Sequence, residues 1–173
     1  VIPPIVAGGV WRMMLDVSFG PVNQMLGWIV GATVTANWLL DPVLIYPTII
    51  VTEVWEWTPF MFLILLAALS NVDPNQLEAA EVDGAGFWTI FFRISLPAIW
   101  PVMIVALLIR GLDLVRLFDI VWALTKGGPG TLTETISVYM YTMGFQRFAT
   151  SYTGAMAFVI IFVAIGLLFR SFR

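Results

Sequence analysis

The sequence predicts an all-α membrane protein that crosses the bilayer several times. Hydrophobic residues make up 60% of the 173 positions and charged residues only 11%. The mean hydropathy is +0.95, and three apolar segments are long enough to span a membrane. A soluble domain of this size cannot bury so much apolar surface in one core, so the composition excludes that class. An isoelectric point near 4.7 and a net charge of −3, without a basic cluster, exclude a nucleic-acid-binding protein.

Two residue types are absent from these 173 residues, cysteine and histidine. Disulfides, thiol nucleophiles, imidazole bases and the usual zinc ligand sets are therefore excluded. We expect no catalytic residue, no metal site and no cofactor bound by this chain.

The three apolar segments cover residues 43–70, 96–124 and 152–169. Only the third is free of charge throughout, and its small residues, such as Gly154 and Gly166, suit close packing against other helices. Residues 1–11 are also apolar, but they start with Val1 and lack the basic region of a signal peptide. We interpret them as the end of a spanning helix whose beginning precedes this sequence.

Two connectors contain turn and interface signals. Residues 12–41 combine breaks at Gly20-Pro21 and Asp41-Pro42 with two tryptophans, Trp28 and Trp38, and Trp11 lies directly before this range. This pattern predicts an interfacial loop with one short amphipathic helix. Residues 126–150 open with a Gly-Gly-Pro turn, and helical spacing over 133–145 predicts a second surface helix. The basic loop residues do not decide the orientation, because three fall on each side of the membrane. They are Arg12, Lys126 and Arg147 on one side and Arg93, Arg170 and Arg173 on the other.

The connector at residues 71–95 is unusually acidic, and its first residues have the sequence pattern of a helix N-terminus. Asp73 can cap it, Pro74 suits the first helical position, and Gln76 completes a capping box. Glycines at 84 and 86 end this helix about three turns later, and an aromatic segment leads to the next span. A small face flanked by carboxylates suits a groove with basic edges on another protein.

The residues in this connector resemble the EAA signature of the inner-membrane permease subunits of binding-protein-dependent ABC importers. The matching positions are Glu78-Ala79-Ala80, Gly84, Ile94 and Leu96-Pro97, with Asp83 in its usual place before the glycine. Further stretches resemble the maltose/glycerol-3-phosphate-type branch of that family: Trp55 with 58–60, Phe118-Asp119, 124–129 and 133–135. The resemblance covers nearly the whole chain in the right order.

The resemblance implies a type I importer permease core, a single transmembrane domain over residues 1–173 whose full subunit has further helices before Val1. It implies that 71–95 is a cytoplasmic coupling loop seated in a cleft of a separate ATPase subunit, with Glu78 paired to a basic residue there. The coupling residues implied are Glu78, Ala79, Ala80, Asp83, Gly84, Ile94, Leu96 and Pro97. The implied partners are a second homologous permease subunit, two ATPase subunits that bind ATP and Mg²⁺, an extracytoplasmic solute-binding protein and lipid, in a prokaryotic inner membrane.

Charged residues within the second predicted span recur at steps of three. Arg110, Asp113, Arg116 and Asp119 alternate in sign and sum to zero. Neighbours three apart on a helix can pair, which lowers the cost of about 2.5–3.5 kcal/mol for each charge at mid-depth. Two interpretations stay open: a ladder that only packs helices, or a hydrophilic wall of the translocation pathway. We favour the packing role most for Asp119.

Two other groups of residues have open roles. Glu53 and Glu56 flank Trp55 in the first span, where they either contact a sugar or lie solvated at the outer interface; we favour the interface slightly. Gly127-Gly128-Pro129 either ends a helix or, as the resemblance implies, lies on the side of the solute-binding protein.

The function expected from these observations is that of a permease subunit, not an enzyme, which imports a sugar, polyol or related solute by ATP-driven alternating access. The balanced charges favour a neutral solute over glycerol phosphate, phosphate or a polyamine, which remain alternatives. Two further alternatives are an ion-gradient-driven transporter, which leaves the acidic connector unexplained, and a membrane scaffold, which predicts no transport.

Overall fold

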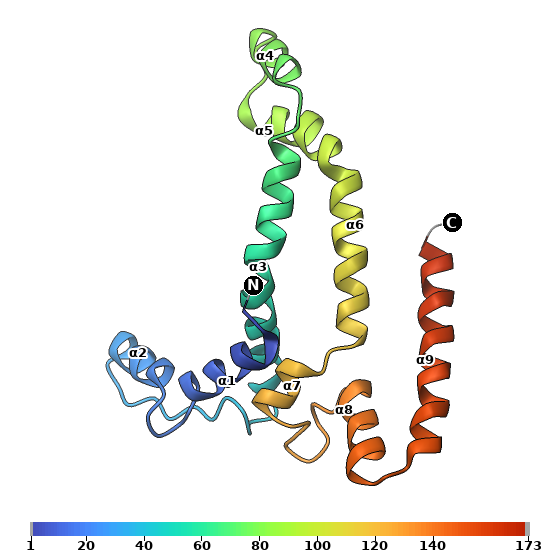
Figure 1. Cartoon of the computed structure of the whole chain (residues 1–173). Helices are drawn as coiled ribbons and strands as arrows, with labels where there is room; N and C mark the ends of the chain where they lie inside the picture. The colour runs from blue at the N-terminus through green and yellow to red at the C-terminus, as the bar shows by residue number, and fades with distance from the viewer. Residues whose placement is uncertain (1, 172–173) are drawn as a thin grey trace. The chain divides into compact units, whose positions relative to one another are not determined.

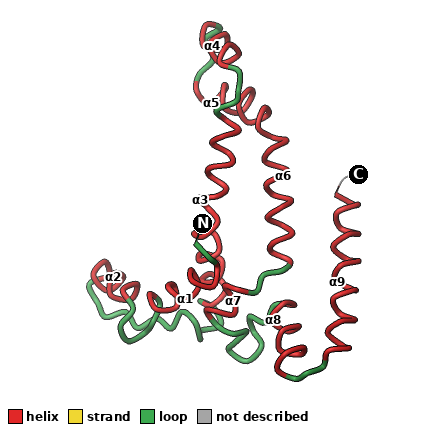
Figure 2. Tube along the Cα trace, viewed as in Figure 1, coloured by secondary structure: helices red, strands yellow, loops and turns green. Residues whose placement is uncertain are grey.

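The structure is a computed structural model that describes residues 2–171, and every regular element in this range is a helix (Figure 2). The described chain forms two compact units. The first is Trp57–Asp113, and the second contains Ile2–Glu56 and the residues from Leu114 onward. Arg173, counted above for orientation, lies outside the described residues.

The second unit contains most of the helices (Figure 1). They are α1 (Pro4–Met14), α2 (Pro21–Val30), the first half of α3 (Ile45–Leu69), α7 (Asp119–Leu124), α8 (Ile136–Tyr141), the π-helical turn η2 (Thr142–Gln146) and α9 (Thr150–Ser171). Its hydrophobic core lies where α3, α7 and α8 meet, and Trp11 of α1 packs against it. The core residues are Ile45, Ile49, Ile120, Val121, Leu124 and Val138.

Helix α1 packs closely on α7 because a glycine faces it. A Cβ atom added to Gly8 would lie 2.6 Å from the Cβ of Ala123, so only a glycine fits there. Arg12 then donates a hydrogen bond from Nη1 to the carbonyl oxygen of Ala123, at 3.4 Å. The apolar start of the chain is therefore part of the core of this unit.

Helix α2 is the short helix expected within residues 12–41. Pro21 begins it, where a missing amide costs nothing. The buried Asn23 ties it to the following segment: its Nδ2 donates to the carbonyl of Ala36 at 3.0 Å, and its Oδ1 accepts from Trp38 Nε1 at 2.8 Å. A satisfied buried amide fixes this fold-back of the chain.

The first unit is a helical hairpin. It contains the second half of α3, then α4 (Pro74–Val82), α5 (Phe87–Ile90), the π-helical turn η1 (Phe91–Ser95) and α6 (Leu96–Val115). Figure 1 shows α4 at the tip, between the ends of the two long helices. Within the described residues, Ile45–Leu69 and Phe87–Val115 are long and apolar enough to cross a membrane.

The second spanning helix differs from the sequence prediction of 96–124 at both ends. It begins at Phe87, since the aromatic segment expected as a connector is helical and continuous with α6. It ends at Val115, and the residues after it make contacts within the second unit. Thr135 Oγ1 donates to the carbonyl oxygen of Leu117 at 2.7 Å, and the Phe118 ring stacks on Trp122 with centroids 5.6 Å apart.

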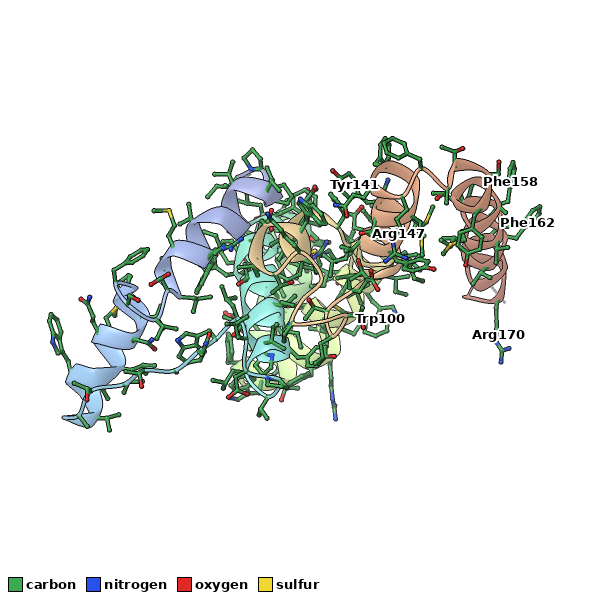
Figure 3. All side chains as sticks on the ribbon, turned by 90° about the horizontal axis from the view of Figure 1, so that it is seen from below. Trp100, Tyr141, Arg147, Phe158, Phe162 and Arg170 are labelled. Atoms are coloured by element: carbon green, nitrogen blue, oxygen red, sulfur yellow. The ribbon has the colours of Figure 1, made fainter. Side chains whose placement is uncertain are left out.

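The third predicted span, 152–169, lies within α9, and the segment Thr150–Gly166 is apolar. Phe158 and Phe162 point outward from α9 (Figure 3) and are largely exposed. The described apolar part is shorter than a full span. Its crossing of the membrane therefore stays a prediction.

Candidate functional site

The candidate coupling site is α4, an exposed helix closed at both ends by its own residues. At its start, Asp73 Oδ1 accepts a hydrogen bond from the backbone amide of Asn75 at 2.9 Å. At its end, the amide of Gly84 donates to the carbonyl of Glu81 at 3.0 Å and that of Ala85 to the carbonyl of Ala80 at 2.9 Å. These are the two bonds of a Schellman motif.

Gly84 is the residue that allows this ending. Its φ of +77° is the left-handed conformation, which a side chain makes costly. The prediction that a glycine ends this helix is confirmed. No side chain of α4 is buried, so the helix contributes an exposed surface and almost no core.

The signature residues are divided between α4 and the later elements η1 and α6. Glu78, Ala79 and Asp83 share the exposed α4 segment with Gly84, and Ala80 is only partly exposed. In contrast, Ile94 belongs to η1, and Leu96 and Pro97 form the first turn of α6. The signature therefore consists of one exposed helix and the start of the helix that follows it.

A contact that sequence reasoning missed joins the two long helices of the first unit. The guanidinium of Arg110 on α6 lies over the Trp57 ring of α3, 4.1 Å from its centroid. Phe60 meets the same ring edge-on at 5.8 Å. An arginine in one apolar span and a tryptophan in another are the signal that could have suggested this cation–π contact.

The four charged residues predicted as one ladder do not share a helix. Arg110 and Asp113 lie on α6, Arg116 follows its end, and Asp119 starts α7. The break at residues 116–118 separates them. Asp119 is exposed in the first turn of α7, where a carboxylate interacts favourably with the helix dipole.

The expectation that Glu53 and Glu56 are solvated is wrong, because their exposed fractions are 8% and 6%. They continue a buried stripe of α3 that recurs every three or four residues. This stripe consists of Ile45, Thr48, Ile49, Thr52, Glu53 and Glu56. The Trp55 side chain lies outside this buried stripe and is about half exposed. Its ring contacts the Trp11 ring edge-on, with the ring centroids 5.7 Å apart. The structure therefore does not place the tryptophan and both carboxylates on one face.

The Gly127-Gly128-Pro129 turn is held by a network of hydrogen bonds. The buried Thr133 donates from Oγ1 to the carbonyl of Gly128 at 2.8 Å and lies 2.7 Å from Thr125 Oγ1. Gly127 has φ +90°, and an added Cβ would lie 3.2 Å from a methyl of Val138. The turn is thus a rigid part of the second unit and not only a helix ending.

A cavity of about 320 Å³ opens beside this turn. Its polar lining comes from Arg12, Asp16, Ser18 and Asn37, and Gly128 contributes to its wall.

On α8, a hydrogen bond with the Tyr152 side chain raises the pKa of the Tyr139 hydroxyl. The described residues contain no group of three side chains that could hold a metal ion.

Residues 1–173 match the family of binding-protein-dependent transport system inner membrane components. The chain belongs to this family. It is 36% identical over 173 residues to the trehalose/maltose transport system permease protein MalF of Thermococcus litoralis, which covers 95% of this chain. It is 33% identical to the sulfoquinovosyl glycerol transport system permease protein SmoG of Agrobacterium fabrum, over 91% of this chain and 51% of the relative.

Solved structures of permeases have the same fold. A bacterial alginate ABC transporter in complex with an alginate pentasaccharide-bound periplasmic protein contains a chain that is 31% identical, with a TM-score of 0.77 over 94% of this chain and 59% of that one. A second structure, of a bacterial ABC transporter involved in alginate import, gives 0.71 at 29% identity, over 98% of this chain and 61% of that one. The chain spans 58% and 56% of the lengths of two relatives that match it along nearly all its residues.

Proposed function

We propose that this chain is the membrane-spanning core of a permease subunit in an ATP-driven importer. The importer takes up a sugar, polyol or related solute delivered by an extracytoplasmic binding protein. The subunit crosses a prokaryotic inner membrane several times and pairs with a second homologous permease. It hydrolyses nothing itself, since ATP and Mg²⁺ bind to two separate ATPase subunits.

The observation that carries this proposal is the exposed, self-capped α4 at the tip of a hairpin of two apolar helices. Because no side chain of α4 is buried, packing within the subunit contributes little to the stability of this helix. Capped at both ends, it is preformed for a partner, and Glu78 and Glu81 supply the charge for basic residues in a cleft. Movement of the ATPase cleft then acts on α3 and α6 through the short links at 70–73 and 83–86.

The proposed solute class rests on the relatives. MalF of Thermococcus litoralis is named for trehalose and maltose, and LacF of Rhizobium radiobacter, 33% identical over 139 residues, for lactose. The contact of Trp57 with Arg110 supports this class, because aromatic and polar groups on spanning helices suit a polyhydroxylated solute. The pathway residues proposed are Glu53, Trp55, Glu56, Arg110, Asp113, Arg116 and Asp119.

The test compares Glu78→Lys with wild type in liposomes that contain the whole transporter. We expect ATP-dependent solute uptake to fall by at least tenfold, because a reversed charge in the cleft costs more than about 1.4 kcal/mol. The matched control is Gln76→Lys, which adds a positive charge to the same helix about 200° around its axis. This control retains most of the uptake.

ATP hydrolysis and complex assembly are measured in the same preparations. Loss of uptake in Glu78→Lys, with the complex still assembled, supports coupling through α4. Normal, ATP-coupled uptake in that variant contradicts it. Uptake driven by an ion gradient without ATP would show that the protein belongs to a secondary transporter and not to an ATP-driven importer.

A further inference from the structure

Four aromatic side chains at the start of the second spanning helix form one continuous cluster, which we call the aromatic collar: Phe87, Trp88, Phe91 and Phe92. Phe87 stacks on Phe91 with centroids 6.5 Å apart, and Trp88 stacks on Phe92 at 6.0 Å. The two stacks meet where Trp88 contacts Phe91 edge-on. The collar therefore covers two neighbouring faces of one helix.

The collar is open to its surroundings. Phe87 is 72% exposed, Trp88 67% and Phe92 56%. Such a contiguous apolar surface on a soluble face would be costly and marks contact with another phase or molecule. The helix itself does not cover it.

The length of the helix determines where the collar lies in a bilayer. Helix α6 alone has 20 residues, about 30 Å at 1.5 Å per residue, which matches the thickness of the hydrocarbon core, about 30 Å. The helix α5 and the turn η1, which precede α6 and bend away from its axis (Figure 1), therefore lie in the headgroup region at the end of this span. The collar lies on α5 and η1, directly after α4. The exposed carboxylates of α4 require water, so the collar adjoins the aqueous side of the membrane.

We propose that the aromatic collar binds the phospholipid headgroup region and fixes the depth of the α4 end of the hairpin. Its rings lie at the boundary between acyl chains and headgroups, where tryptophan is favoured. Arg93, exposed on the next residue after the collar, extends its guanidinium to the lipid phosphates. This site lies on the hairpin beside the coupling helix, and it does not depend on the role of Glu78.

The collar also has a mechanical consequence. A helix end held at a constant depth resists being pushed along the membrane normal. A force applied at α4 then tilts α6 about the collar and does not slide the helix through the bilayer. The lipid contact would thus determine the kind of movement that α4 can cause.

Quenching of Trp88 fluorescence tests the proposal in the assembled transporter in nanodiscs. The emission lost in Trp88→Phe is the signal of Trp88 itself, and phenylalanine keeps the collar apolar. We expect lipids brominated near the glycerol to reduce this signal severalfold more than lipids brominated near the end of the acyl chain. Equal emission with brominated and ordinary lipids would overturn the lipid contact.

Spin labels give a second measurement that does not need tryptophan. Because these residues contain no cysteine, Phe92→Cys can be labelled and compared with Val82→Cys on α4 and Leu107→Cys in the middle of α6. The ratio of collisions with oxygen to collisions with a water-soluble nickel complex should lie between those of the two controls. A ratio equal to that of Val82→Cys contradicts the proposal, as does a low oxygen collision rate that appears only when the ATPase subunits are bound. The second result would assign the collar to a protein interface.

Discussion

The exposed helix α4 and the Gly127-Gly128-Pro129 turn are two connecting regions that the structure stabilises in opposite ways. In α4, the hydrogen bonds are local, from Asp73 and the Schellman closure, and no side chain is buried. In the turn, Thr133 is buried and bonds to Gly128 and Thr125 across the loop, and a long-range bond from Tyr46 of α3 to the carbonyl of Leu132, at 2.7 Å, ties the loop to α3.

This difference separates a movable part from a fixed one. A region held by local bonds can shift as a rigid helix without breaking a core, and it can open locally at a low free-energy cost. A region held by long-range bonds moves only with its unit. We therefore expect substitutions near the turn to affect the stability of the whole subunit, and substitutions on α4 to affect transport or local order.

The largest effect is expected for Gly8→Val in the packed unit. The new Cβ would meet Ala123 at 2.6 Å and force α1 away from α7, so the free energy of unfolding should fall by about 3 kcal/mol. Equilibrium unfolding in mixed micelles measures it. Gly9→Val is the control, because no atom lies within 4 Å of its added Cβ. Equal losses in both variants would show that the α1–α7 contact is not close.

The same substitution at two positions compares the regions directly. Val121 is 1% exposed in the core and Val82 is 88% exposed on α4. Val121→Ala should lower the free energy of unfolding by about 2 kcal/mol, since it removes buried methyl groups and leaves a cavity. Val82→Ala should change it by less than about 0.5 kcal/mol. A comparable loss at Val82, measured without the ATPase subunits, would mean that α4 packs against the subunit.

The smallest effect concerns the cap of α4. Asp73→Ala removes the side-chain acceptor for Asn75 and should destabilise this helix by about 1 kcal/mol. Amide hydrogen exchange in α4 should then speed up by about fivefold, while the unfolding of the subunit stays unchanged. Asp73→Ser keeps a capping oxygen and should exchange at nearly the wild-type rate. An unaltered rate in Asp73→Ala would show that other contacts hold the helix.

Sequence reasoning succeeded where the signal is local. The start of α4 at Asp73-Pro74 and its end at Gly84 depend on backbone chemistry within a few residues, and the structure confirms both. The helix within 133–145 also follows from its spacing, although Thr135 caps it and a π-helical turn completes it. Membership of the permease family rested on residue types at defined intervals, which the sequence displays directly.

Sequence reasoning failed where distant residues decide. The second span was expected to continue to residue 124, because every residue up to there is compatible with a helix. In the structure the helix ends at Val115, and Thr135, 18 residues beyond Leu117, donates to the Leu117 carbonyl. The same break places Asp119 on α7, whereas Arg110 and Asp113 lie on α6.

By itself, the sequence therefore determined that this is an all-α membrane chain, where its exposed acidic helix begins and ends, and which family it resembles. These properties depend on composition, capping and spacing, which are local. Only the tertiary structure decided that Glu53 and Glu56 are buried, that Trp57 meets Arg110, and that four aromatic residues form one collar on a longer helix. Burial and pairing depend on which faces of separate helices come together, and periodicity along one helix does not specify its neighbours.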